Sequence, residues 1–212
     1  MGEKPKHPYT LANQITILRI LFIFPFVICM LSVHNPRRGE MMRYIATLFF
    51  LVMSISDAVD GYLARMKKQT SRLGAFLDPL ADKLLITCAC ILLSLKETLI
   101  EGYRLPGAVV VLIIGKDLLL ALGFVISYLL TYQIRILPVF AGKIATFLQL
   151  AMVLCILISP EMESWIPHWK MWVRILWTLT AGSAIAAAIV YIWGGIRYIE
   201  QFEKMEKEQA DL

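Results

Sequence analysis

Charged residues are scarce in this chain, and its cysteines form no recognisable metal-binding pattern. Only 17% of the 212 residues are Asp, Glu, Lys or Arg, whereas 58% are hydrophobic. This composition is too apolar for an ordinary soluble domain and excludes a disordered chain. All four cysteines lie in apolar segments, and Cys88-x-Cys90 is not a zinc-ligand spacing. Neither a zinc site nor a disulfide framework is therefore predicted.

Three further patterns are missing. The polar start and Arg19 within the first apolar run, with no small-residue cleavage site after it, argue against a cleavable signal peptide. No segment alternates between polar and apolar residues as a strand does, which leaves helices as the spanning form. No basic run or aromatic-basic face occurs outside the apolar segments, so no nucleic-acid partner is expected.

Long hydrophobic segments run evenly from one end of the chain to the other. A bilayer span needs about 20 mostly apolar residues. Six candidates satisfy this, at about 14–33, 42–64, 75–95, 106–132, 138–159 and 172–195. We therefore expect an all-α integral membrane protein with six transmembrane helices in a single domain, residues 1–212. A polar segment, 1–12, would precede the helices, and a charged tail, 200–212, would follow them.

The expected orientation follows from the basic residues. Six spans place both termini on the same side, together with the loop at 65–74, and this side carries slightly more Lys and Arg. We therefore predict that the termini and this loop face the cytoplasm. A net charge of +5 suits contact with anionic membrane lipids.

Four aspartates in or beside the apolar segments are the most informative feature of the chain. Asp57 and Asp60 are spaced i, i+3, and Asp78 and Asp82 are spaced i, i+4, so each pair shares one helical face. The short polar linker between them makes the two helices antiparallel neighbours. Ionised carboxylates are costly in a membrane unless a counter-charge is present, and a divalent cation supplies one. The pattern predicts a polar, metal-binding cavity that opens to the cytoplasmic side.

Other interpretations of this cluster remain. The carboxylates could form ion pairs with Arg19, Arg65 or Lys83 that hold helices together. They could form the cation relay of a transporter, although neither broken helices nor an internal inverted repeat supports this. Small residues such as Gly61 and Ala64 could serve close helix packing alone.

The complete spacing resembles the signature of the CDP-alcohol phosphatidyltransferases. The matched positions are Asp57, Asp60, Gly61, Ala64, Arg65, Gly74, Asp78 and Asp82. The resemblance implies a six-helix membrane enzyme that uses a CDP-linked lipid, one or two Mg²⁺ or Mn²⁺ ions, and is usually a homodimer. A bacterial inner-membrane location is expected.

The resemblance also implies roles for individual residues. Asp57, Asp60 and Asp78 would be metal ligands, and Asp82 would be a ligand, the general base that deprotonates the acceptor hydroxyl, or both. The CDP-lipid site would be lined by Asp57, Asp60, Gly61, Ala64, Arg65, Ser71 and Gly74. The donor would be CDP-diacylglycerol, and CMP would be the leaving group.

The acceptor is less closely defined. Asn13-x-x-Thr16-x-x-Arg19 and Gly142-Lys143-x-x-Thr146-x-x-Gln149 resemble the phosphatidylglycerophosphate synthases, whose acceptor is sn-glycerol 3-phosphate. Lys116, Arg135 and Lys143 are the candidates for binding its phosphate. The Lys116-Asp117 pair also resembles cardiolipin synthases, whose acceptor is phosphatidylglycerol, and other alcohols remain possible. Asp117 could instead neutralise Lys116.

Small residues between 181 and 188 predict close helix packing in the last span. Gly182 lies within this run, which otherwise contains mainly alanine. We expect the run to pack inside the protomer or at a dimer interface.

Overall fold

The structure is a computed structural model. It describes the backbone of residues 11–67, 72–96, 98, 100, 102–131 and 140–210. Within these ranges, side chains are described except at 11–15, 57–80, 82, 124, 126–131 and 198–210.

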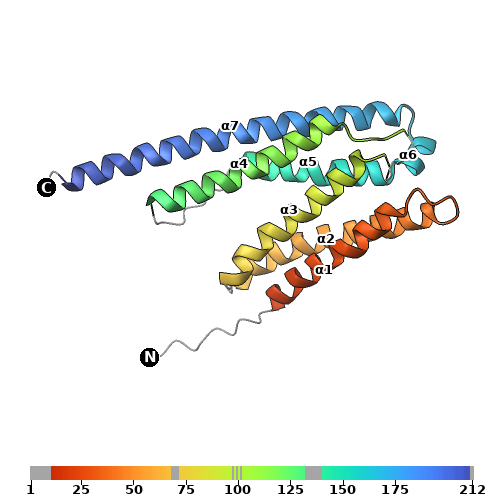
Figure 1. The fold of residues 1–212 in the computed structure, drawn as a ribbon, viewed down its shortest axis with the longest axis horizontal. Helices are drawn as coiled ribbons and strands as arrows, with labels where there is room; N and C mark the ends of the chain where they lie inside the picture. Colours follow the sequence, from red (N-terminus) through yellow and green to blue (C-terminus); the bar gives the residue numbers. More distant parts are fainter. Residues whose placement is uncertain are drawn as a thin grey trace. The chain divides into compact units, whose positions relative to one another are not determined.

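The described parts of the chain are helical and contain no strand, as predicted (Figure 1). Their helices are α1 Leu11–Leu31, α2 Gly39–Lys67, α3 Arg72–Ser94, α4 Gly107–Thr131, α5 Phe140–Leu157, α6 Ser159–Trp165 and α7 Trp169–Ala210. Six of them coincide with the six predicted segments, and α7 continues into the charged tail. The short helix α6 was not predicted, because its seven residues mix polar, acidic and aromatic side chains without a helical apolar period.

The turn from α1 to α2 depends on Asn35 and Gly39. The Asn35 carbonyl accepts the amide of Gly39 at 2.7 Å, and the Asn35 side-chain oxygen accepts the amide of Arg37 at 3.0 Å. Gly39 lies so close to the carbonyl of Val33 that a side chain at this position would collide with the backbone. This lack of space explains why a glycine begins α2.

The chain divides into two compact units, and each is described by itself. Unit 1 comprises Met1–Pro106 and Val153–Val173, and unit 2 comprises Gly107–Met152 and Arg174–Leu212. The prediction of a single domain stays a prediction.

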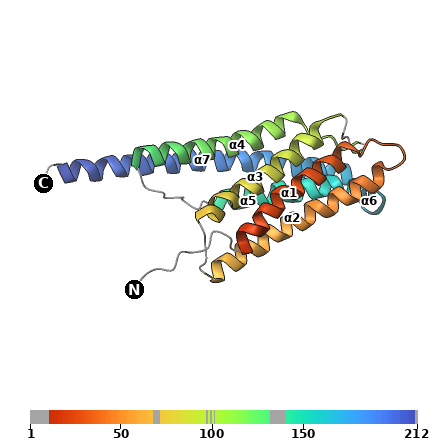
Figure 2. The ribbon, with the colours of Figure 1, turned by 60° about the horizontal axis from the view of Figure 1, so that its bottom comes forward.

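In unit 1, α1 packs against both α2 and α3 (Figures 1 and 2). The rings of Phe22 and Phe49 are 5.6 Å apart, and those of Phe26 and Phe50 are 6.1 Å apart. Phe26 and Phe50 are almost fully buried. These aromatic contacts hold α2 against α1 over its apolar first half.

In unit 2, α4 runs alongside α7 in both ribbon views. Helix α5 contacts α7 through the side chains of Thr180 and Tyr191. Ala184 and Ala187 on α7 are buried, which confirms close packing within part of the small-residue run. Gly182 is different, because nothing in the described chain lies within 4 Å of the place that a Cβ would take. Gly182 therefore does not pack closely inside the described protomer, and its packing at a dimer interface stays a prediction.

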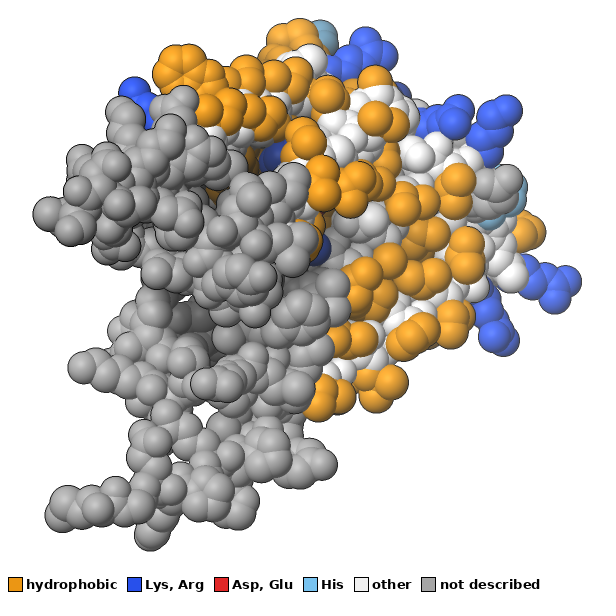
Figure 3. Space-filling model, turned by 60° about the vertical axis from the view of Figure 1, so that its left-hand side comes forward, with side chains coloured by type: hydrophobic (Ala, Val, Ile, Leu, Met, Phe, Trp, Pro, Cys, Tyr) orange, Lys and Arg blue, Asp and Glu red, His pale blue; other side chains and the backbone are white. Residues whose placement is uncertain are grey.

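Exposed apolar side chains support membrane insertion. On the face shown in Figure 3, hydrophobic side chains cover much of the described surface, and Lys and Arg gather toward its edges. Three helical stretches in the described chain are long and apolar enough to cross a membrane: Gly39–Ser56, Phe140–Leu157 and Trp169–Arg197. Trp165 and Trp172 are 82% and 55% exposed, as expected for interfacial anchors. The protein is a helical membrane protein.

Candidate active site

The predicted donor site lies on two successive helices of unit 1. Asp57 and Asp60 lie on α2, and Asp78 and Asp82 lie on α3. Their backbone is helical, so the i, i+3 and i, i+4 spacings place each pair on one face. Gly61, Ala64 and Arg65 follow on α2, and Gly74 lies on α3. Ser71 and the side chains of all these residues lie outside the described part of the structure.

The aspartates of α2 continue a buried stripe. Ala46, Phe50 and Met53 are at most 1% exposed and are spaced i, i+4, i+7. Asp57 follows Met53 by four residues, and Asp60 follows Asp57 by three, so both continue the series. The helical period therefore puts both positions in register with these buried residues along α2.

Helix α3 also has a series of buried residues, which leads to its aspartates when it is followed toward the N-terminus. Leu93, Ala89 and Ile86 are at most 2% exposed, and their series continues to Asp82 and then Asp78. Because α1 contacts both helices and α2 contacts α3, the two buried stripes belong to the same core. The helical register of both aspartate pairs follows these stripes, while the surroundings of their side chains lie outside the described part of the structure.

Helix α1 adds two buried polar residues to this unit. Thr16 is 1% exposed and Arg19 is 3% exposed. They are one turn apart on the helix that contacts both α2 and α3. The sequence showed them as part of a motif, but their burial is a result of the tertiary structure.

The carboxylate donor set fits a hard divalent cation. Four aspartates supply only oxygen ligands, which Mg²⁺ and Mn²⁺ prefer. Among the residues whose side chains are described, no group of three or more His, Cys, Asp or Glu could hold a metal. The four aspartates lie outside that set, so the metal site stays a prediction.

Two of the predicted acceptor-binding residues are described, and both lie in unit 2. The ammonium of Lys116 on α4 forms an ion pair of 2.7 Å with Asp117, and the Lys116 side chain is 2% exposed. This confirms that Asp117 neutralises Lys116. Lys143, near the start of α5, is exposed. Arg135 lies outside the described residues.

The first turn of α5 packs closely on α7. The hydroxyl of Tyr191 lies against the α-carbon of Gly142, where it leaves no room for a methyl group. Farther along α5, the side chain of Gln149 is fully buried. The sequence showed Gly142 and Gln149 in one motif, but their surroundings were not predictable from it.

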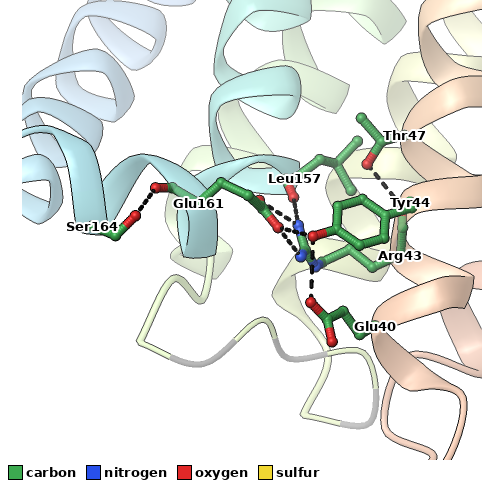
Figure 4. A network of polar contacts seen from close by, with 7 residues as sticks. All are labelled: Glu40, Arg43, Tyr44, Thr47, Leu157, Glu161 and Ser164. Atoms are coloured by element: carbon green, nitrogen blue, oxygen red, sulfur yellow. Dashed lines mark hydrogen bonds and ion pairs between the residues drawn. The ribbon is translucent and has the colours of Figure 1, made fainter.

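A polar network lies at the other end of α2 from the aspartates (Figure 4). Arg43 is 5% exposed, and it donates to the Leu157 carbonyl at 2.7 Å and to both carboxylate oxygens of Glu161 on α6. Tyr44 donates to Glu161 at 2.7 Å and lies 3.3 Å from Glu40. Fourteen residues separate Arg43 from Asp57, or about 21 Å of helix. The network therefore holds α2 in place without being part of the site.

The pKa of Glu161 reflects this network. Its hydrogen bonds with Arg43, and then with Tyr44, lower its pKa from 4.5 to about 2 despite partial burial.

On the loop before α4, burial and a 2.9 Å hydrogen bond to Glu163 raise the pKa of Tyr103 to about 12. Lys170, 2.6 Å from Glu163, lowers the pKa of that carboxyl. Both glutamates are therefore anionic at neutral pH.

Comparison with known proteins identifies the group to which the chain is similar. The profile of the CDP-alcohol phosphatidyltransferases matches residues 9–195. The chain belongs to the CDP-alcohol phosphatidyltransferase family. It is accordingly a transferase of phospholipid biosynthesis, and the transporter interpretation gains no support.

The relatives that the chain matches include two phosphatidyltransferases of the same name and a cardiolipin synthase fusion protein. A Bacillus subtilis CDP-diacylglycerol–glycerol-3-phosphate 3-phosphatidyltransferase is 30% identical over 185 residues, which cover 82% of this chain and 92% of the relative. The Haemophilus influenzae protein of the same name is 44% identical over 79 residues, 37% of this chain and 40% of that protein. A Schizosaccharomyces pombe cardiolipin synthase/mitochondrial hydrolase fusion protein is 39% identical over 121 residues, 57% of this chain and 18% of the relative.

Proposed function

We propose that the protein transfers the phosphatidyl group of CDP-diacylglycerol to sn-glycerol 3-phosphate, giving phosphatidylglycerophosphate and CMP. The observation that supports the chemistry is the helical register of Asp57 and Asp60 on α2 and of Asp78 and Asp82 on α3, which follows the buried residues of the same helices. The acceptor is supported by the Bacillus subtilis relative, whose similarity covers most of both chains.

The four aspartates would hold one or two divalent cations, which we propose to be Mg²⁺ or Mn²⁺; the family is known to use divalent cations. Such a cation would supply positive charge that offsets the charge of the donor pyrophosphate. The chain supplies the remaining functions. Arg65, one residue beyond Ala64 on α2, binds a donor phosphate through its planar guanidinium. Gly61, Ala64 and Gly74 leave space for the nucleotide, and Ser71 offers it a hydroxyl.

Asp82 is proposed as the general base. It removes the proton of the primary hydroxyl of glycerol 3-phosphate while that oxygen attacks the lipid-side phosphorus. The new phosphorus–oxygen bond forms as the bond to CMP breaks, and CMP leaves with the electron pair. An ionised carboxylate is available near neutral pH when positive charge is nearby.

Lys143, Lys116 and Arg135 are proposed to bind the acceptor phosphate. The exposed ammonium of Lys143 is accessible to a ligand. Lys116 is already paired with Asp117, so its contribution is weaker, because the aspartate offsets its charge.

Cardiolipin synthesis, with phosphatidylglycerol as the acceptor, is the second candidate. It is favoured by the 39% identity to the Schizosaccharomyces pombe fusion protein. That similarity covers only 57% of this chain, which makes it the weaker candidate.

We further propose six membrane spans, a site that faces the cytoplasm of a bacterial inner membrane, and a homodimer. The six long helices coincide with the six apolar segments of the sequence. Both termini then lie on the cytoplasmic side with the aspartates, and the α6 network lies on the opposite side.

Release of CMP from CDP-diacylglycerol tests the proposed function. Purified protein in detergent micelles is given Mg²⁺ or Mn²⁺ and one alcohol at a time: glycerol 3-phosphate, phosphatidylglycerol, inositol or serine. We expect CMP release with glycerol 3-phosphate and none in excess chelator. Release with phosphatidylglycerol alone would instead establish the second candidate.

A further inference from the structure

Arg19 lies on the buried face of α1. Thr16, Arg19, Ile23, Phe26 and Met30 recur every three or four residues along this helix, and none of the five is more than 7% exposed. The guanidinium of Arg19 is therefore a positive charge inside unit 1, on a helix face that otherwise carries uncharged side chains. A charge in such surroundings is stable only beside a negative group.

The contact between α1 and α2 sets the level of Arg19 along α2. The two helices are antiparallel neighbours joined by a short turn (Figures 1 and 2). The rings of Phe26 and Phe50 meet with their centroids 6.1 Å apart. Arg19 lies seven residues before Phe26, and Asp57 lies seven residues after Phe50, so each is about 10 Å from its phenylalanine along its own helix axis. Because the helices run in opposite directions, both displacements lead toward the same end of the pair.

The second aromatic pair and the direction of the Arg19 side chain agree with this level. Phe22 and Phe49, 5.6 Å apart, place Arg19 within about 8 Å of Asp57 along the axis. Side chains on a helix lean toward its N-terminus and cover the preceding turn. On α1 this direction corresponds to the C-terminal end of the antiparallel α2. Position 57 therefore lies on the side to which the Arg19 side chain extends.

The described carboxylates of unit 1 are engaged elsewhere. Glu40 and Glu161 belong to the polar network at the beginning of α2 (Figure 4), and Glu163 is paired with Lys170. Asp57 is the acidic position that the helix register itself brings to the level of the α1 arginine.

We propose that Arg19 pairs with the carboxylate of Asp57 and is a fixed counter-charge of the donor site. Arg19 is thus a positioning residue, and the pair holds α1 against α2 when no cation is bound. In the presence of a cation, Arg19 offsets part of the remaining negative charge, because one divalent ion neutralises only two of the four aspartate charges. The pair itself is independent of the proposed function, whereas its effect on a cation rests on that function.

This role predicts the sign of a measurable effect. The charge of Arg19 opposes cation binding, because like charges repel and because the guanidinium competes for one of the ligands. An arginine that served only the fold would act in the opposite sense, since its loss would loosen the site and weaken cation binding. The direction of the change in cation affinity therefore separates the two roles.

The first test uses purified protein in detergent, with Mn²⁺ as the probe and the melting temperature in excess chelator as a second readout. Arg19→Met should lower the melting temperature in chelator by several degrees, yet tighten Mn²⁺ binding by about 10-fold. Arg19→Lys keeps the charge and should bind Mn²⁺ nearly as wild type does. Arg43→Met removes a second buried arginine of unit 1, at the other end of α2, and is the matched control. It should lower the melting temperature without tightening Mn²⁺ binding.

A double-mutant cycle in chelator tests the partner. Arg19→Met combined with Asp57→Asn should melt at a higher temperature than Arg19→Met alone, because the second change removes the carboxylate that the first leaves unpaired. Asp60→Asn in place of Asp57→Asn should restore less. If Arg19→Met does not fold by itself, a folded double variant supports the pair and an unfolded one overturns it.

The outcomes separate this inference from the proposed function. Unchanged or weaker Mn²⁺ binding by a folded Arg19→Met protein would overturn the counter-charge, and so would a double variant no more stable than Arg19→Met. Both results leave the transfer reaction intact. If the wild-type protein binds no Mn²⁺ and releases no CMP while the cycle shows coupling, the proposed function fails and the ion pair stands.

Discussion

Arg43 and Glu161, 118 residues apart, are joined by two charge-assisted hydrogen bonds between α2 and α6. The guanidinium is buried and also binds the Leu157 carbonyl at 2.7 Å, whereas the Glu161 side chain remains 31% exposed. The pair therefore ties the beginning of α2 to the segment between α5 and α7.

Replacement of Arg43 by lysine should destabilise unit 1. Lysine cannot bind a carboxylate and a carbonyl with the planar geometry of arginine, so a buried hydrogen bond is lost. We expect a loss of about 1–3 kcal/mol, measured as a melting temperature lowered by several degrees in detergent. Arg38→Lys, at an exposed position before α2, is the matched control and should leave the melting temperature unchanged. Equal melting curves for both variants would contradict this prediction.

The contribution of Glu161 should depend on pH. Its folded-state pKa of about 2 lies below the ordinary value of 4.5 that applies in the unfolded chain. The stabilisation is therefore fully present above about pH 4.5 and is lost as the pH falls toward 2. The measurement is the difference in melting temperature between wild type and Glu161→Gln across this range. The difference should be largest at neutral pH and shrink on acidification; a constant difference would exclude an electrostatic origin.

Gly142→Ala should lower stability, whereas Gly182→Ala should not. A methyl group at position 142 displaces the Tyr191 hydroxyl, at a cost of about 1–3 kcal/mol. Gly182 has open space, and alanine favours a helix interior by about 0.5–1 kcal/mol. The two melting temperatures should therefore move in opposite directions. Tyr191→Phe should restore part of the loss in Gly142→Ala, because it removes the atom that the methyl group displaces.

Asp82→Asn should abolish transfer without loss of the fold. The amide is close in shape to the carboxylate but cannot accept the proton of the acceptor, so kcat should fall about 100-fold or more. CMP release measures this fall, and the unchanged melting temperature shows that the fold is retained. Asp117→Asn, outside the motif, is the comparison and should retain far more activity. Activity of Asp82→Asn near the wild-type level would remove Asp82 as the general base.

Arg65→Ala and Lys143→Ala should separate donor binding from acceptor binding. Loss of the Arg65 guanidinium should raise the apparent KM for CDP-diacylglycerol. Loss of the Lys143 ammonium should instead raise the apparent KM for glycerol 3-phosphate and barely change that of the donor. Saturation curves for each variant, with one substrate varied at a time, measure both effects. A change of the donor curve alone in Lys143→Ala would show that the acceptor pocket is assigned wrongly.

The sequence by itself determined the helical architecture and the two aspartate pairs. These features depend on contacts within a few residues: a bilayer-length apolar segment forms a helix, and the i, i+3 and i, i+4 spacings put side chains on one face. The pairing of Lys116 with Asp117 was also accessible, since the two residues are adjacent.

The tertiary structure alone decided which faces are buried and what they meet. The Arg43–Glu161 pair, the contact of Tyr191 with Gly142 and the buried amide of Gln149 join or enclose residues far apart in the chain. The small residues of α7 illustrate the reason. The sequence does not distinguish Gly182, which is open, from Ala184, which is buried, because helical periodicity gives an angle around the axis but not the neighbour that fills it.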